Sequence, residues 1–163
     1  MKSIRGLYSE SAIFLDSNIL VLLIAGQVRP NLLPKLSPGN IHFSIDDFEL
    51  IIKILGQFKE TRTTPYILTE VNSLLNSKLD HNSGLECREK FAEYIPLLVN
   101  TYTDPKKLAA HSLFSVFGLA DISIVEACDN ALVLTDDDRL IGLLKDSCNV
   151  LNYNTLKQLI EEN

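Results

Sequence analysis

The sequence lacks several features that would assign a function quickly. Its three cysteines, Cys87, Cys128 and Cys148, form no Cys-x-x-Cys pair, and their odd number argues against a disulfide-stapled domain. We therefore expect three small thiols in the core and a reducing compartment. The three histidines lie far apart and near no cysteine at ligand spacing, so the sequence gives no support for a zinc site.

Sequence patterns for nucleotide-binding loops and membrane-spanning helices are also absent. The chain has no Gly-x-Gly, no Gly-x4-Gly-Lys and no Gly-x-Ser-x-Gly motif, which argues against the common phosphate-binding loops and nucleophile elbows. The apolar stretch 12–26 is interrupted by Asp16, Ser17 and Asn18, and it is too short to cross a bilayer. No cleavage pattern follows Lys2 and Arg5. We expect a soluble, cytoplasmic protein with no membrane contact.

Positive charge is scarce: 21 acidic residues face 15 basic ones, and the formal net charge is −6. A protein that coats nucleic acid neutralises phosphates with Lys and Arg, so that class is disfavoured. A nuclease remains compatible, because bound cations invert the field of the acids that hold them. The basic residues available for RNA are scattered and read as ordinary surface residues: Arg62, Lys106, Lys107, Arg139 and Lys145.

The chain does have enough apolar material for one folded domain. Its 163 residues are 46% hydrophobic, so we expect a single domain over 1–163. Predicted strands alternate with predicted helices, which favours an α/β fold: a three-layer α/β/α sandwich with a mainly parallel central sheet. Strands are expected at 12–15, 66–68, 131–134 and 149–151; helices at 17–25, 44–55, 70 onward, 86–99, 105–117, 119–129, 137–145 and 154 onward.

Glycine, proline and cap residues set the expected boundaries. Gly26 reads as the C-cap of the first helix, and three prolines predict a loop over 27–43. Thr69 reads as the N-cap of the helix that carries Glu70, and Asn154 as the cap of the last helix. Residues 82–84 read as a turn, and Gly118 as a helix break.

Four acids lie where an apolar run meets a helix start. Asp16 ends the strand 12–15, Glu70 follows 66–69, Asp121 opens an apolar helix, and Asp137 lies in the triple acid 136–138. Because parallel strands end at one edge of a sheet, we expect these carboxylates to gather there. Clustered carboxylates repel unless a cation lies among them, and Mg²⁺ or Mn²⁺ prefers such oxygens.

Each acid also has a purely structural explanation. Asp16 or Ser17 can simply cap a helix, and Glu70 gains from the helix dipole without any ligand. Asp136, Asp137 and Asp138 can form a solvated capping cluster. All four positions together are harder to explain in this way. With two divalent ions the site would hydrolyse a phosphodiester, one ion activating a water and the other stabilising the leaving oxygen.

Four short motifs contain these acids, in the order Leu15-Asp16-Ser17-Asn18, Leu68-Thr69-Glu70-Val71, Gly118-Leu119-Ala120-Asp121 and Thr135-Asp136-Asp137-Asp138. In this order they resemble the first, second, third and fourth (Thr-x-Asp) motifs of the PIN domain family, which includes VapC-type toxins and PilT N-terminus-like ribonucleases. Two departures are a long interval between the first two motifs and the pair Arg139-Leu140, where the family usually has an acid and an aromatic residue.

The resemblance implies a metal-dependent endoribonuclease, with the toxin of a toxin–antitoxin pair as one form. Asp16, Glu70, Asp121 and Asp137 carry over as the catalytic, metal-binding acids, and Asp136 and Asp138 are alternatives for the fourth role. Ser17, Asn18 and Thr135 carry over as supporting groups. The implied partners are Mg²⁺ or Mn²⁺, an RNA substrate, an antitoxin protein and a second copy in a homodimer. The apolar positions of 48–55 and 91–98 could form a dimer face, although core packing is the favoured use.

Two other functions stay open. A PIN-like module could bind RNA or a protein without cutting, which the acidic charge favours. A Mg²⁺-dependent phosphatase of haloacid-dehalogenase type begins with Asp-x-Asp after a strand, but Asn18 stands at the second acidic position here. The intact set of acids favours the ribonuclease, because clustered carboxylates with no cation destabilise the fold.

Overall fold

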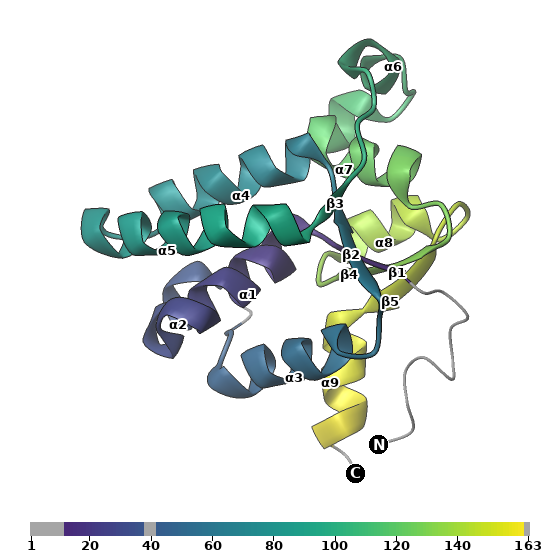
Figure 1. The fold of residues 1–163 in the computed structure, drawn as a ribbon. Helices are drawn as coiled ribbons and strands as arrows, with labels where there is room; N and C mark the ends of the chain where they lie inside the picture. Colours follow the sequence, from purple (N-terminus) through teal and green to yellow (C-terminus); the bar gives the residue numbers. More distant parts are fainter. Residues whose placement is uncertain (1–11, 38–41, 162–163) are drawn as a thin grey trace.

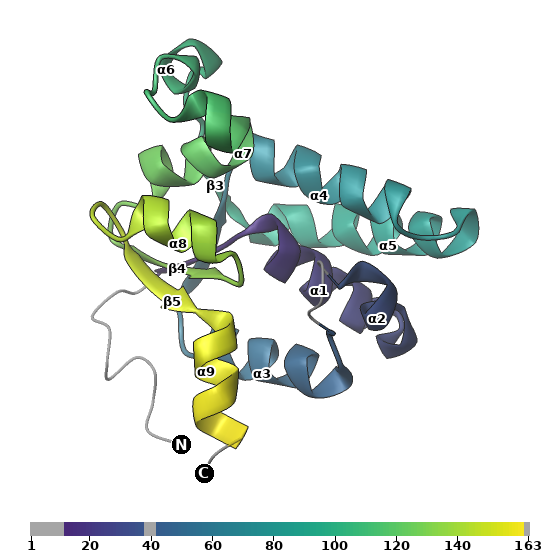
Figure 2. The ribbon, with the colours of Figure 1, turned by 180° about the vertical axis from the view of Figure 1, so that it is seen from behind.

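The computed structural model describes residues 12–37 and 42–161. A five-stranded sheet with the order β3-β2-β1-β4-β5 lies between layers of helices (Figures 1 and 2). Every strand pair in this sheet is parallel. The α/β/α sandwich with a parallel central sheet is therefore confirmed. The strands are β1 (Ala12–Leu15), β2 (Glu60–Thr63), β3 (Val99–Asn100), β4 (Ala131–Thr135) and β5 (Asn149–Asn152).

The helices of the described residues pack on both faces of this sheet (Figure 1). None of them combines the length and apolar character needed to cross a membrane. They are α1 (Ser17–Val28), η2 (Pro30–Leu32), α2 (Leu33–Leu36), α3 (Ile45–Leu55), α4 (Pro65–Ser77), α5 (His81–Tyr94), η3 (Ile95–Leu97), α6 (Pro105–Ala109), α7 (Phe114–Ala127), α8 (Asp138–Leu144) and α9 (Tyr153–Glu161).

The centre of the core is formed by β1, β4 and α1. Both strands are buried along their whole length, as expected for parallel strands covered on two faces. Helix α1 is buried from Ile19 to Gly26. Leu15 lies in register with Leu134, and the Asp16 N–H donates to the Leu134 carbonyl at 3.2 Å. This pairing brings the ends of β1 and β4 together and sets Asp16 beside Thr135.

The predicted end of the first helix is wrong. Helix α1 continues to Val28, so Gly26 lies inside it and Arg29 is the C-cap. A Cβ at position 26 would lie 2.2 Å from Cδ2 of Phe48, so this glycine allows α3 to pack closely on α1. The predicted loop 27–43 is also partly wrong, since it contains η2 and α2. Its residues 38–41 lie outside the described residues.

The predicted strand at 66–68 is wrong as well, because these residues belong to α4. The Thr64 side chain accepts from the Ile67 N–H and Pro65 takes the first helical position, a favourable helix start. The real strand, β2, is polar and lies just before it. Thr69 is therefore not a cap: it lies inside α4, where its hydroxyl donates to the Pro65 carbonyl at 2.8 Å. Glu70 consequently sits in the second turn of α4.

The helix boundaries predicted after residue 80 are partly right and partly wrong. The predicted turn at 82–84 is wrong, because Asp80 caps α5 through the Ser83 N–H. The predicted helix 86–99 instead ends at Tyr94 and gives way to η3 and β3. Asp104 caps α6 as expected, but α6 stops at Ala109. The predicted break at Gly118 is a kink inside α7.

The last two elements follow the prediction more closely. Strand β5 (Asn149–Asn152) covers the predicted strand 149–151, and helix α9 follows it. The predicted cap Asn154 is wrong, because Asn152 accepts from the Thr155 N–H at 3.1 Å.

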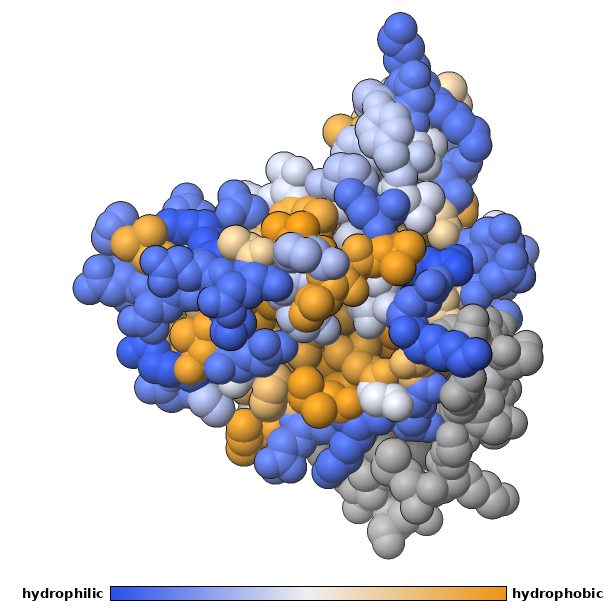
Figure 3. Space-filling view, in the orientation of Figure 1, coloured by the Kyte–Doolittle hydropathy of each residue, from blue (hydrophilic) through white to orange (hydrophobic). Residues whose placement is uncertain are grey.

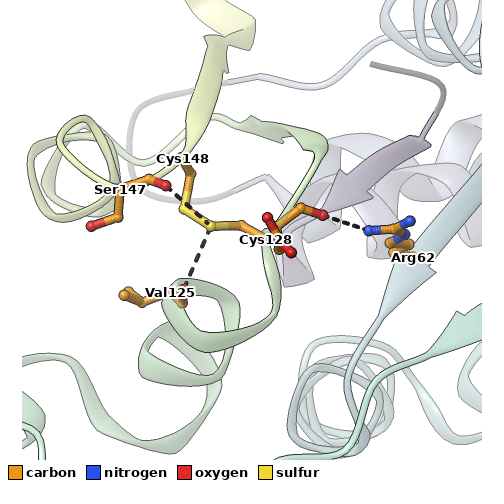
Figure 4. The surroundings of a disulfide bond; sticks show 6 residues. Arg62, Val125, Cys128, Ser147 and Cys148 are labelled. Atoms are coloured by element: carbon orange, nitrogen blue, oxygen red, sulfur yellow. Dashed lines mark hydrogen bonds between the residues drawn. A yellow bond between two sulfur atoms is a disulfide. The ribbon is translucent and has the colours of Figure 1, made fainter.

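Two of the three cysteines form a disulfide, so the prediction of three free thiols is wrong for them. Cys128 at the end of α7 is bonded to Cys148 just before β5, with the Cα atoms 5.9 Å apart (Figure 4). In the same view Arg62 donates to the Asp129 carbonyl at 2.6 Å, which ties β2 to the turn that follows Cys128. Cys87 is free and buried in the core, as predicted.

Candidate functional site

The four predicted acids line one pocket at the edge of the sheet where β1 and β4 end. The pocket has a volume of about 100 Å³. Asp16 arrives from β1, Glu70 from α4, Asp121 from α7 and Asp137 from the β4–α8 junction. This is the edge at which open parallel sheets bind their ligands. The complete lining among the described residues is Asp16, Ser17, Asn18, Glu70, Asp121, Asp137 and Leu140.

Asp16 is the most buried of these acids, with 4% of its surface exposed. One carboxylate oxygen caps α1 by accepting the Ile19 N–H at 2.9 Å, and the other accepts the Thr135 hydroxyl. Burial raises the pKa of Asp16 to about 8, and the nearby charge of Asp136 contributes to the increase. The cap role considered from the sequence is therefore real, but it leaves the carboxylate in an environment that disfavours its negative charge.

Glu70 is exposed on α4 and turns toward the start of α1. The Ser17 hydroxyl donates to Glu70 Oε2 at 2.5 Å. Helix α4 is itself joined to α7 by a buried contact of 2.7 Å between the hydroxyl oxygens of Thr64 and Ser123. Both residues are fully buried, so this bond fixes helix α4, which carries Glu70, against helix α7, which carries Asp121.

Asp121 lies three residues after the kink of α7. Gly118 has a φ of +78°, a conformation that glycine adopts at little cost. A Cβ there would meet no atom within 4 Å, so conformation rather than space explains the glycine. Burial raises the pKa of Asp121 to about 6; the charges of Glu70 and Asp137 add to the shift and Arg139 opposes it.

The three consecutive acids after β4 have different surroundings. Asp137 lines the pocket and caps α8, accepting the N–H groups of Arg139 at 2.7 Å and Leu140 at 3.3 Å. Asp138 is exposed and accepts from Asn152 at 2.9 Å; it is absent from the pocket lining. Of the three candidates for the fourth acid, only Asp137 faces the pocket.

Asp136 is buried behind the pocket, with 5% of its surface exposed. Its Oδ1 accepts from Asn18 at 3.1 Å, while its Oδ2 is buried without a hydrogen-bond partner. Burial raises its pKa, and the charge of Asp137 adds to this effect. An unpartnered, buried carboxylate oxygen beside Asp16 is costly unless it is protonated or a cation approaches.

The donor types suit a hard divalent cation, but the oxygens do not form a ready-made coordination sphere. No three His, Cys, Asp or Glu side chains within 12–37 and 42–161 are placed to hold one ion. The carboxylates of Asp16, Glu70 and Asp137 each accept a hydrogen bond from protein. A cation would therefore compete with these bonds. It would also offset the burial and the repulsion that raise the pKa values of Asp16 and Asp121.

Sequence reasoning missed some of the groups that organise this pocket. Leu140 lines it, and the Thr64–Ser123 bond positions two of the acids without touching the pocket lining. The Thr-Pro pair before α4 signals a helix start, but no sequence pattern indicates that Thr64 would meet Ser123 across the fold. Asn18 and Thr135 were expected as supporting groups, and they contact Asp136 and Asp16 respectively.

No protein-family model matches this chain, and no curated protein matches it either.

Proposed function

We propose that this protein is a PIN-like, Mg²⁺- or Mn²⁺-dependent endoribonuclease that hydrolyses RNA phosphodiester bonds. The observation that supports the proposal is the pocket itself: Asp16, Glu70, Asp121 and Asp137 come from four separate parts of the chain and line one cavity. Capping alone explains Asp16 and Asp137, but it does not explain why Asp121 and Glu70 face the same space.

The residues have distinct roles in this proposal. Asp16, Asp121 and Asp137 would hold the cation, and Glu70 would complete the set from the exposed side. When bound, the cation supplies an activated water and charge stabilisation at the phosphate. Ser17 orients Glu70 through its hydroxyl, and Thr135 orients both Asp16 and Asp137, donating to the first and accepting the N–H of the second at 3.0 Å.

An RNA cleavage assay with Mn²⁺ tests the proposal. Asp16→Asn keeps the shape of the side chain but removes its charge, and we expect it to reduce cleavage at least about a thousandfold, since cation-mediated stabilisation amounts to several kcal/mol. The matched control is Asp138→Asn, which alters an exposed acid two residues from Asp136; its rate should stay within about twofold. Equal activity of Asp16→Asn and wild type would disprove the site.

A second candidate is a PIN-like module that binds RNA or a protein without cleaving it. It is favoured by the hydrogen bonds that already occupy three of the carboxylates and by the lack of a three-ligand group among the described residues. RNA binding with no cleavage in Mg²⁺ or Mn²⁺ would support this candidate over the enzyme.

The resemblance extends the proposal to partners and location. We therefore also propose that the protein binds an antitoxin protein, forms a homodimer and is located in the cytoplasm. Figure 3 shows apolar surface gathered near the centre of one face, and the exposed apolar residues include Ile95, Leu97 and Val99 of η3 and β3. The Cys128–Cys148 disulfide counts against the cytoplasm, because such bonds are rare in reducing compartments.

A further inference from the structure

Arg139 is a positively charged residue next to the acid pocket. It lies in the first turn of α8, two residues after the pocket residue Asp137, and its backbone N–H donates to the Asp137 carboxylate. Its neighbour Leu140 lines the pocket, whereas the lining among the described residues contains no Lys or Arg. The positive charge of Arg139 also acts on Asp121, which lies on α7.

The guanidinium group is held in place but is not saturated. Its centre lies 5.6 Å from the centroid of the Phe117 ring, within the range of a cation–π contact. One N–H of its Nη2 donates to the Val116 carbonyl at 3.3 Å. Arginine has five N–H donors, and within the described residues no other protein acceptor takes one of them. Contacts to α7 therefore orient a group that is exposed and keeps donors for a ligand.

An RNA strand that approaches this pocket meets a strongly unfavourable charge. Four carboxylates line the cavity, and the chain carries a net charge of −6. A guanidinium group binds phosphate through two parallel hydrogen bonds, which also fix the orientation of the phosphate. A preoriented arginine beside Asp121 offsets the repulsion at the point where the backbone would enter.

We propose that Arg139 binds one phosphate of the RNA backbone at the mouth of the acid pocket and holds the strand across it. This inference rests on the proposed function, since it takes RNA as the substrate. Arg139 would contact the phosphodiester backbone rather than a base, so it should contribute equally to the binding of RNA strands of different sequence.

The test measures binding of a labelled single-stranded RNA oligonucleotide by fluorescence anisotropy in Mn²⁺, over a series of KCl concentrations. Glu70→Gln serves as the background, so that cleavage does not interfere. In this background Arg139→Met should weaken binding about tenfold or more and reduce the slope of log K against log salt by about 0.7, the value for one single-strand phosphate contact. Arg139→Lys should keep the slope but bind more weakly, because it loses the paired donors.

Lys53→Met is the matched control, because it removes one positive charge from an exposed side chain of α3. Lys53 lies shortly before β2 begins and thus at the opposite edge of the sheet. Its affinity and slope should equal those of the background. If Arg139→Met lowers thermal stability but leaves the salt slope unchanged, Arg139 is only a clamp between α7 and α8 and the inference is wrong. Absence of any RNA binding also overturns it.

The same series separates this inference from the proposed function. If wild-type protein fails to cleave RNA while the Arg139→Met slope still falls, the nuclease proposal fails and the phosphate contact stands. If wild-type protein cleaves RNA and Arg139→Met leaves the slope unchanged, the nuclease proposal stands and the phosphate contact fails.

Discussion

Two buried aspartates, Asp16 and Asp47, have opposite surroundings in the same fold. Asp47 in α3 is 2% exposed and Asp16 is 4% exposed. Asp47 is contacted by Lys157 at 2.9 Å and by the Tyr153 hydroxyl at 2.6 Å, both from α9. Asp16 faces Asp136 and Asp121 instead of a cation.

The pKa values follow these surroundings. Burial alone would raise the pKa of Asp47, but hydrogen bonds from Lys157, Tyr153 and Ser44 outweigh it and lower the pKa. At Asp16 burial and the charge of Asp136 raise it to about 8. A buried carboxylate with a full set of donors and a cation is a structural link, here between α3 and α9. One that is buried among other carboxylates indicates a site that is completed by a ligand.

The largest stability effect is expected at the structural link. Asp47→Asn removes the negative charge that pairs with Lys157. It also replaces one of the two acceptor oxygens with an NH2 group, so the donors on that side lose their acceptor. We expect it to lower the free energy of unfolding by about 3 kcal/mol, measured by urea denaturation. The control is Asp46→Asn on the exposed side of the same helix turn, expected within about 0.5 kcal/mol. Equal effects of the two substitutions would show that the Asp47 cluster contributes no more than a surface residue.

The next effect concerns the acid pocket and a bound cation. A ligand that binds only the folded state stabilises it by about 2.7 kcal/mol at a hundred times its Kd, which raises the Tm of a chain of this size by roughly 5–11 °C. We expect such a rise with Mn²⁺, measured by a thermal melt. Asp121→Asn should abolish the rise, whereas Asp47→Asn should lower the Tm but keep the shift. A rise of the same size in wild type and Asp121→Asn would place the cation elsewhere.

The smallest effect, counted per pH unit, is a difference in the pH dependence of stability without metal. The pKa of Asp47 is lowered in the folded state, so its stabilisation is present above the ordinary value of 3.8 and is lost as the pH falls further. The pKa of Asp16 is raised from 3.8 to about 8, so stability is lost as the pH rises through that window. The slope for one proton is at most about 1.4 kcal/mol per pH unit.

Each substitution should therefore flatten only one side of the stability curve. Asp16→Asn should reduce the loss of stability between pH 4 and 8, and Asp47→Asn the loss at acid pH. Urea midpoints at several pH values in EDTA measure both. An unchanged curve for Asp16→Asn would mean that the folded protein does not resist ionisation of this carboxylate.

The sequence allowed the central elements to be predicted because their signals are local. Strands β1 and β4 follow from continuous apolar runs, the first ending directly before Asp16 and the second at Thr135, just before Asp136. Strand β2 was missed because Glu60–Thr63 is polar and only partly buried. Its extended conformation is determined by pairing with β1 and not by its own composition. The apolar residues 66–68 were misread for the complementary reason, since a short apolar run fits a buried strand and a buried helix face equally well.

The candidate site was also predictable only in part. Parallel topology predicted that Asp16 and the acids after β4 would meet, because β1 and β4 end at the same edge of the sheet. Glu70 and Asp121 line the same pocket, but they come from helices α4 and α7 rather than from strand ends. The sequence did not show which of Asp136, Asp137 and Asp138 faces the pocket, because consecutive residues after a strand point in different directions. Their directions depend on where α8 begins, which is at Asp138. The Cys128–Cys148 pairing was equally hidden, as it depends on β4 and β5 lying side by side.

That disulfide has a consequence for the integrity of the chain. It joins positions 20 residues apart, and the enclosed segment carries β4, Asp136, Asp137 and α8. A protease that cut once inside this segment would produce two fragments that remain covalently linked. Such a nick would go unnoticed on a non-reducing gel, and only a reductant would release the two pieces.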